Sequence, residues 1–223
     1  MPVLTFLARV VDGMLLVASM EQSSSEASHR EHKHQAKLLL KRLNSRSPAK
    51  MSIDSGSHVF HYIIEDGVCF LTLCARDYPK RLAFAYLADI HGGFVSELQR
   101  EHGPAWRSRI DTADRPYKFI KFDKYIQRQR KAYADPRSRD NAARLNDDLT
   151  DITAIMRKNI AEVLDRGEQL ENVSRISSRL ATESDKFRWQ AKRLNALEWL
   201  KKHAPAVAAA LIVSAVVYLR FLA

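Results

Sequence analysis

A single arginine, Arg166, stands in the middle of a long apolar seam in the C-terminal half of the sequence. A guanidinium carries five N–H donors and no acceptor, so its burial is costly unless neighbouring helices supply hydrogen-bond acceptors. The seam follows alternating steps of three and four residues and consists of Ala142, Leu145, Leu149, Ile152, Met156, Asn159, Val163, Arg166, Leu170, Val173, Ser177, Leu180, Ser184, Phe187, Ala191 and Leu194. A solitary helix would leave this stripe in water, so the pattern predicts one long helix from residue 141 that pairs with partner helices.

The residues around Arg166 carry a family resemblance. The segments Ile155–Ile160 and Val163–Leu170 resemble the SNARE motif of R-SNAREs. The resemblance implies that Arg166 is the zero-layer arginine, which meets one glutamine from each of three partner helices in a parallel four-helix bundle. One charged side chain and three amides fix the register of the four helices and which helices can join the bundle, at a cost in stability. From the residues alone, an ordinary two-stranded coiled coil is the alternative.

The N-terminal part extends the resemblance over nearly the whole chain. Leu4–Gly13, Phe60–Phe70, Leu82–Leu87 and Arg115–Tyr117 are similar to the ER-to-Golgi branch of longin-type R-SNAREs, the Sec-twenty-two family. This implies a profilin-like longin fold and vesicle traffic between the endoplasmic reticulum and the Golgi, with no cofactor.

The same resemblance implies a closed form of the protein. Relatives use an Asn-Ile-Glu segment to fold the SNARE motif back on the longin domain, and the COPII coat recognises that shape. Here Ala161 interrupts the segment, and Asn159, Ile160 and Glu162 remain as the expected longin-contacting residues.

The C-terminus has the composition of a membrane anchor. Residues 204–219 include no charged side chain, and the four residues that follow extend the segment to about 30 Å of helix, enough to span a bilayer. An aromatic and basic collar of Trp199, Lys201, Lys202 and His203 marks the cytosolic side. We therefore expect a tail anchor at residues 201–223 with the N-terminus in the cytosol. Its short, alanine-rich character favours the thin membranes of the endoplasmic reticulum and early Golgi and their transport vesicles.

The first 131 residues predict an α+β domain, a five-stranded antiparallel sheet with helices on both faces. Asp12-Gly13 and Asp66-Gly67 each lie between two apolar runs, a pattern that predicts two-residue hairpins. The expected strands are Val3–Val11, Met14–Met20, Met51–Ser55, His58–Glu65 and Val68–Ala75.

Three helices are expected to cover this sheet. Ser28 and Glu31 have capping-box spacing at the start of the first helix, and Pro79 opens the second. Phe119, Phe122 and Ile126 mark the third, while the polar stretch from Gly92 to Arg115 is expected to be a loop or a frayed helix. The predicted organisation is a longin domain at 1–131, a linker at 132–140, the SNARE motif at 141–200 and the anchor at 201–223.

Several other functions are disfavoured. The spacing of His29 and His32 could suit a metal ion, but no carboxylate or thiol completes a site with them or with His34. Cys69 and Cys74 are spaced to face opposite sides of a strand. The formal charge of +10 suits anionic membranes, and no nucleic-acid motif accompanies it. No phosphate loop or nucleophile motif is present, so we expect no enzyme. We expect the helix to zipper with its partner helices and drive vesicle fusion. The alternative is a non-fusing role as a membrane tether or coat or cargo adaptor, which uses the same elements.

Overall fold

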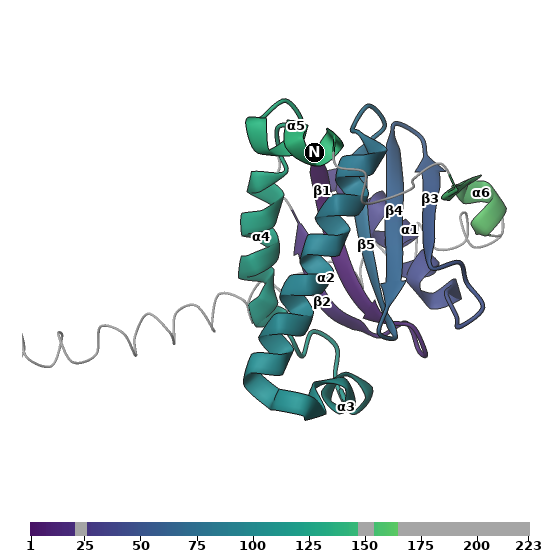
Figure 1. Ribbon diagram of the computed structural model, residues 1–223. Helices are drawn as coiled ribbons and strands as arrows, with labels where there is room; N and C mark the ends of the chain where they lie inside the picture. Colours follow the sequence, from purple (N-terminus) through teal and green to yellow (C-terminus); the bar gives the residue numbers. More distant parts are fainter. Residues whose placement is uncertain (21–25, 147–153, 165–223) are drawn as a thin grey trace, which may run out of the picture. The chain divides into compact units, whose positions relative to one another are not determined.

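A mixed sheet forms the centre of the protein (Figure 1). The computed structural model describes residues 1–20, 26–146 and 154–164. The strand order is β2-β1-β5-β4-β3-β6, and every pair is antiparallel except the last, β3 with β6. The strands are β1 (Pro2–Arg9), β2 (Leu15–Met20), β3 (Lys50–Ser55), β4 (His58–Glu65), β5 (Val68–Ala75) and β6 (Met156–Asn159).

Helices cover both faces of the sheet, as predicted. Helix α1 lies on one face, and α2 and α4 lie on the other (Figure 1). β5 is buried along nearly its whole length because it lies between these layers. The helical elements are α1 (Glu26–Arg42), α2 (Lys80–His102), η1 (Gly103–Ala105), α3 (Trp106–Asp111), η2 (Ile120–Phe122), α4 (Asp123–Ala132), α5 (Arg139–Asn146) and α6 (Ile160–Val163).

Two helix predictions were wrong. Helix α1 extends from Glu26 to Arg42 and so begins before Ser28, the predicted N-cap position. The stretch from Gly92 to Arg115, expected to be a loop or a frayed helix, is mostly packed helix, since α2 continues to His102. Ile90, Phe94 and Leu98 are all buried and extend the apolar stripe at four-residue spacing, which outweighs the low helix propensity of the two glycines.

The two Asp-Gly pairs form different turns. Asp66 and Gly67 have φ of 52° and 75°, as a two-residue type I′ hairpin requires. At the first pair only Gly13 has a positive φ, and the pairing of Ala8 with Leu15 leaves a longer loop. The prediction of a two-residue turn was therefore wrong at this position.

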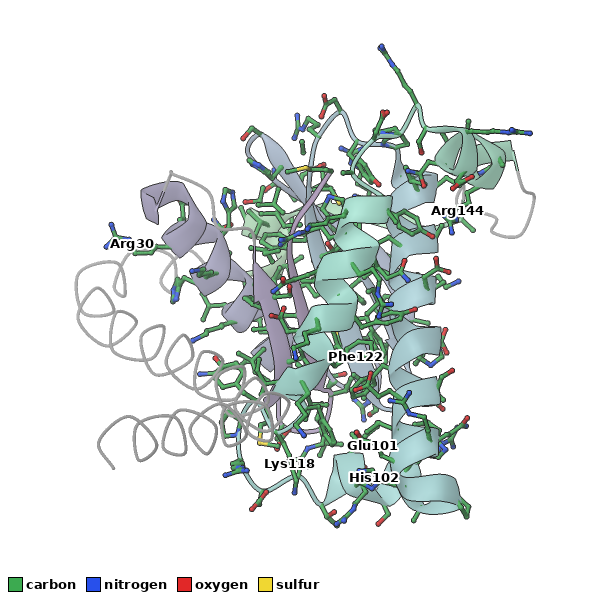
Figure 2. The ribbon with its side chains drawn as sticks, turned by 90° about the vertical axis from the view of Figure 1, so that its left-hand side faces the viewer. Arg30, Glu101, His102, Lys118, Phe122 and Arg144 are labelled. Carbon is green, nitrogen blue, oxygen red and sulfur yellow. The ribbon has the colours of Figure 1, made fainter. Side chains whose placement is uncertain are left out.

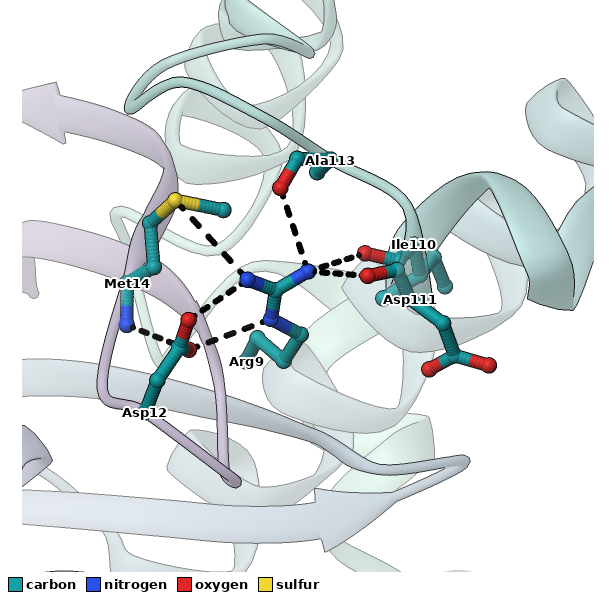
Figure 3. A network of polar contacts seen from close by, with 6 residues as sticks. All are labelled: Arg9, Asp12, Met14, Ile110, Asp111 and Ala113. Carbon is teal, nitrogen blue, oxygen red and sulfur yellow. Dashed lines mark hydrogen bonds and ion pairs between the residues drawn. The ribbon is translucent and has the colours of Figure 1, made fainter.

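The longer loop follows from the contacts of Arg9 (Figure 3). Its guanidinium donates to both carboxylate oxygens of Asp12, at 3.1 and 2.5 Å, and this pair lowers the pKa of Asp12. It also donates to the carbonyl oxygens of Ile110, Asp111 and Ala113 at 2.9, 2.6 and 3.2 Å. Arg9 therefore links the Asp12 side chain in this turn to the end of α3, and the longer loop leaves room for these contacts.

Both cysteines are buried free thiols. Cys74 belongs to the main apolar cluster under α2, and Cys69 lies outside that cluster. Burial raises the pKa of both thiols, so neither is a thiolate at neutral pH.

Candidate functional site

Residues 154–164 are folded back against the edge of the sheet. Met156, Arg157, Lys158 and Asn159 of β6 pair in parallel with Met51, Ser52, Ile53 and Asp54 of β3. Strand β3 would otherwise present unpaired backbone groups at that edge, and an open edge readily accepts another strand. Figure 1 shows β6 and α6 beside β3, far in sequence from the rest of the sheet.

Apolar side chains at the two ends of β6 hold the segment. The four strand residues are themselves exposed. Ile155 precedes them and belongs to the main buried cluster, with 9% of its surface exposed. Ile160 and Leu164 follow and are 8% and 1% exposed. Each side chain buried this way contributes about 1.5–3 kcal/mol, so these three residues dominate the affinity of the segment for the domain.

Arg157 adds a paired contact to β3. Its Nε and NH2 groups donate to the two carboxylate oxygens of Asp54 at 2.9 and 2.7 Å. The hydrogen bond from Arg157 lowers the pKa of Asp54, so the contact is present at neutral pH and is lost as pH falls through that lowered value. The arginine side chain is 52% exposed, so solvent screening limits the pair to about 0.2–1 kcal/mol.

Three basic side chains of the domain bind backbone carbonyls of the segment and of α5. The Lys80 ammonium donates to the Ile155 carbonyl at 3.1 Å. Arg42 donates to the Val163 carbonyl at 2.9 Å, and Arg81 donates to the Leu145 carbonyl at 2.6 Å. These contacts give three backbone carbonyls a hydrogen-bond donor, and they do not depend on which side chains the carbonyl-bearing residues carry.

The buried imidazole of His61 lies on β4, the strand that pairs with β3 on the side away from β6. His61 of β4 shares a 2.9 Å hydrogen bond between its Nδ1 and the hydroxyl of Ser52, which is opposite Arg157. Burial, assisted by the nearby charges of Lys80 and Arg157, lowers the pKa of His61 to about 4. The ring is therefore neutral at pH 7, and its protonation does not change near neutral pH.

Asn159 ends the strand and starts the helix that follows. Its side-chain oxygen accepts from the backbone N–H of Ala161 at 3.0 Å, as an N-cap does. Of the three predicted longin-contacting residues, Ile160 is buried, whereas Asn159 and Glu162 are exposed. Ala161 itself occupies an exposed position in α6, and its backbone serves as the capped group.

Helix α5 is fixed to the domain by a buried amide. Asn141 is fully buried, and its Nδ2 donates to the carbonyls of Ala132 and Asp135 at 2.9 and 2.8 Å. Arg144 packs over the Tyr133 ring at 4.6 Å and lies 3.6 Å from the Asp89 carboxylate. The start of the predicted SNARE motif is therefore docked beside the C-terminal end of α4.

The predicted seam is only partly within the described residues. Ala142 and Leu145 lie in α5, Met156 and Asn159 in β6, and Val163 in α6. The prediction of one continuous helix from residue 141 is wrong for this structure, because residues 156–159 form a strand. The remaining predicted seam residues, Leu149, Ile152, Arg166, Leu170, Val173, Ser177, Leu180, Ser184, Phe187, Ala191 and Leu194, lie outside the described residues.

The residues buried in the closed arrangement are not the seam residues. Met156 is 48% exposed, while Ile155 beside it is buried. Ile160 and Leu164 each follow a seam position by one residue. One stretch of sequence therefore carries two apolar patterns, one for the sheet edge and one for partner helices. Sequence reasoning found Ile160 through the family resemblance and missed Ile155, Leu164, Asp54, Lys80 and Asn141.

The predicted anchor at 201–223 also lies outside the described residues. Within residues 1–20, 26–146 and 154–164, no helix has the length and apolar character needed to cross a bilayer.

Two known families match successive regions of the chain. Residues 16–126 match the longin family, described as a regulated-SNARE-like domain, and residues 141–221 match the synaptobrevin family. The two matches define the class as a longin domain followed by a SNARE motif.

Individual relatives place the chain more closely. It is 43% identical to the vesicle-trafficking protein SEC22b of Xenopus tropicalis, with 99% of each chain covered. It is also 43% identical to the vesicle transport protein SEC22-1 of Arabidopsis thaliana, over 98% of this chain and 95% of that protein. A protein transport protein of Schizosaccharomyces pombe is 38% identical over 96% of each chain. The chain belongs to the Sec-twenty-two family of longin-type R-SNAREs, a family of trafficking proteins and not of enzymes.

Proposed function

We propose that this protein drives the fusion of transport vesicles between the endoplasmic reticulum and the Golgi by zippering with three partner helices. The synaptobrevin match over residues 141–221 and the heptad seam support this proposal. Arg166 is the charged hub and takes one glutamine from each partner as acceptor. The names of the relatives, all vesicle or protein transport proteins, point to the same role.

While residues 154–164 are folded back on the longin domain, the protein is inactive in membrane fusion. Residues 156–159 cannot pair with β3 as a strand and join a four-helix bundle as a helix at the same time, since the two backbone conformations exclude each other. The pairing of β6 with β3 is the observation that carries this part of the proposal. Partner helices then compete with the longin domain for the segment, and a coat such as COPII can select the closed form because it alone presents β6 on the domain.

Lipid mixing tests the fusion role. Liposomes carrying the full chain should mix lipids with liposomes carrying the three matching glutamine helices, whereas a tether would only cluster them. Arg166→Ala leaves three buried amides without their donor, which costs about 1–3 kcal/mol and should slow mixing by roughly tenfold. Arg175→Ala removes the same charge outside the seam and should have little effect. Clustering without mixing for every partner set would reject the fusion role.

The expected subcellular localisation and membrane topology can be tested separately. We propose steady-state residence in the endoplasmic reticulum and early Golgi, with the N-terminus cytosolic, because the short alanine-rich anchor suits a thin bilayer. Four leucines inserted after Ala210 should shift a tagged chain outward, toward thicker membranes. A tagged wild-type chain found mainly at the plasma membrane would contradict the address, and protection of the longin domain from protease in intact microsomes would contradict the topology.

A further inference from the structure

A row of basic side chains lies along the outer face of α4 and the turn before it. Lys121, Lys124, Arg128 and Lys131 are all exposed. They follow one another at intervals of three, four and three residues, so they share one face of the helix. The opposite face carries Ile126, which is fully buried against the domain. We refer to these four residues as the basic row; Figure 2 views the molecule from the side on which α4 lies in front.

The surrounding sequence is strongly one-sided in charge. Between residues 115 and 131 the basic residues are Arg115, Lys118, Lys121, Lys124, Arg128, Arg130 and Lys131, and Asp123 is the sole acidic residue. The Oδ1 atom of Asp123 is buried, and its Oδ2 accepts from Gln127 at 2.6 Å. With one oxygen buried and the other bonded to Gln127, this carboxylate does not neutralise the basic side chains on the outer face.

The chemistry of the row favours lipid head groups over a protein partner. Stable protein interfaces bury an apolar or aromatic centre inside a polar rim. Among the described residues, the large hydrophobic side chains that are exposed are Met1, Val11 and Met156, and none of them lies on α4. A row of cations without an apolar centre matches a surface that offers many phosphate and carboxylate groups, as the cytosolic leaflet does.

We propose that α4 docks on an anionic membrane surface through the basic row. Lysine and arginine near such a surface each strengthen binding by about fivefold, so four of them supply roughly a 10²- to 10³-fold gain. That gain is modest for a free domain. Binding becomes effective when the domain is anchored in a bilayer, because the anchor raises the effective concentration of the basic row near a lipid surface. This contact requires no glutamine partner and no fusion, so it stands or falls apart from the proposed zippering.

Vesicle clustering without partner helices tests the proposal. The full chain is reconstituted into phosphatidylcholine liposomes and mixed with protein-free acceptor vesicles, either of phosphatidylcholine alone or rich in phosphatidylserine. Clustering should occur with the anionic acceptor only and should weaken as salt screens the charges. In the variant Lys121→Gln, Lys124→Gln, Arg128→Gln, Lys131→Gln, the acceptor concentration for half-maximal clustering should rise by roughly 100-fold or more. Glutamine is a good helix former, so circular dichroism should show an unchanged fold.

A charge-matched variant separates the row from net charge. Lys41, Arg46, Lys50 and Arg109 are exposed and lie outside η2 and α4. Replacing all four by glutamine lowers the net charge by the same amount. This control should cluster anionic vesicles nearly as well as the wild type. Equal losses in the two variants, equal clustering of neutral and anionic acceptors, or competition by an RNA oligonucleotide at lower concentration than by anionic vesicles would each overturn the proposal.

Discussion

Replacing Ile160 and Leu164 together by alanine is expected to release residues 154–164 from the edge of the sheet. Both side chains are buried in the folded-back segment, with 8% and 1% of their surfaces exposed. Their loss removes about 3–5 kcal/mol of stabilisation, a figure that combines the area term with the cost of the cavities left behind. Amide hydrogen exchange in β6 should accelerate by roughly 10²- to 10³-fold, while exchange in β4 and β5 should remain slow.

Two neighbouring charges provide matched controls for this release. Arg157→Gln removes the contact with Asp54 and should accelerate exchange by a few fold, in line with an exposed pair worth about 0.2–1 kcal/mol. Lys158→Gln removes the same charge from the next, exposed residue and should leave exchange unchanged. If the double alanine variant kept the wild-type protection of β6, the apolar ends of the segment would not be what holds it.

The same double variant links the closed form to assembly. Ile160 and Leu164 are outside the predicted seam, so their truncation spares the layers that meet partner helices. The variant should therefore join partner helices faster than the wild type, with little change in the thermal stability of the finished complex. A slower rate would mean that the two residues serve the bundle and not the closed form.

Local sequence patterns predicted most strands and helices of the longin domain, because these elements have the residue periodicity and turn residues that their own conformation requires. β4 and β5 match their predicted bounds at both ends, with Asp66-Gly67 at the turn that demands positive φ. The turn at Asp12 was mispredicted because its carboxylate pairs with Arg9. Arg9 in turn donates to carbonyl oxygens of α3, which is about a hundred residues away in the sequence. No local pattern reports such a contact.

The folded-back segment was harder to predict for a similar reason. The sequence Met156-Arg157-Lys158-Asn159 fits a helical heptad, and it becomes a strand only because β3 offers an unpaired edge. Ile155 and Ile160 are five residues apart, a spacing that marks neither a helical stripe nor an alternating strand. Tertiary contacts therefore override the local helical preference of this segment.

Substitution of Asn141 is expected to loosen the junction between the longin domain and the SNARE motif. Asn141→Ala leaves the carbonyls of Ala132 and Asp135 without their donors, and each buried, unsatisfied carbonyl costs about 1–3 kcal/mol. We expect a loss of about 2–4 kcal/mol in the stability of the docked α5, measured as faster proteolysis of residues 133–141. Ala142 and Leu145, the first predicted seam residues, lie in this helix, so its release also exposes the N-terminal end of the seam.

Asn141→Asp distinguishes the hydrogen bonds from simple packing. Aspartate has nearly the same shape, but an ionised carboxylate offers only acceptors to the two carbonyls. The acidic variant should therefore be less stable than the alanine variant at neutral pH, although the nearby Arg144 offsets part of the cost. Repulsion by the carbonyls raises the pKa of the new carboxyl above its usual value near 3.9, so its destabilisation is present above that raised pKa and shrinks as acid protonates the group and restores one donor. Denaturation at neutral pH and in mild acid measures this difference. If Asn141→Asp proved the more stable variant at neutral pH, side-chain volume and not amide donation would dock α5.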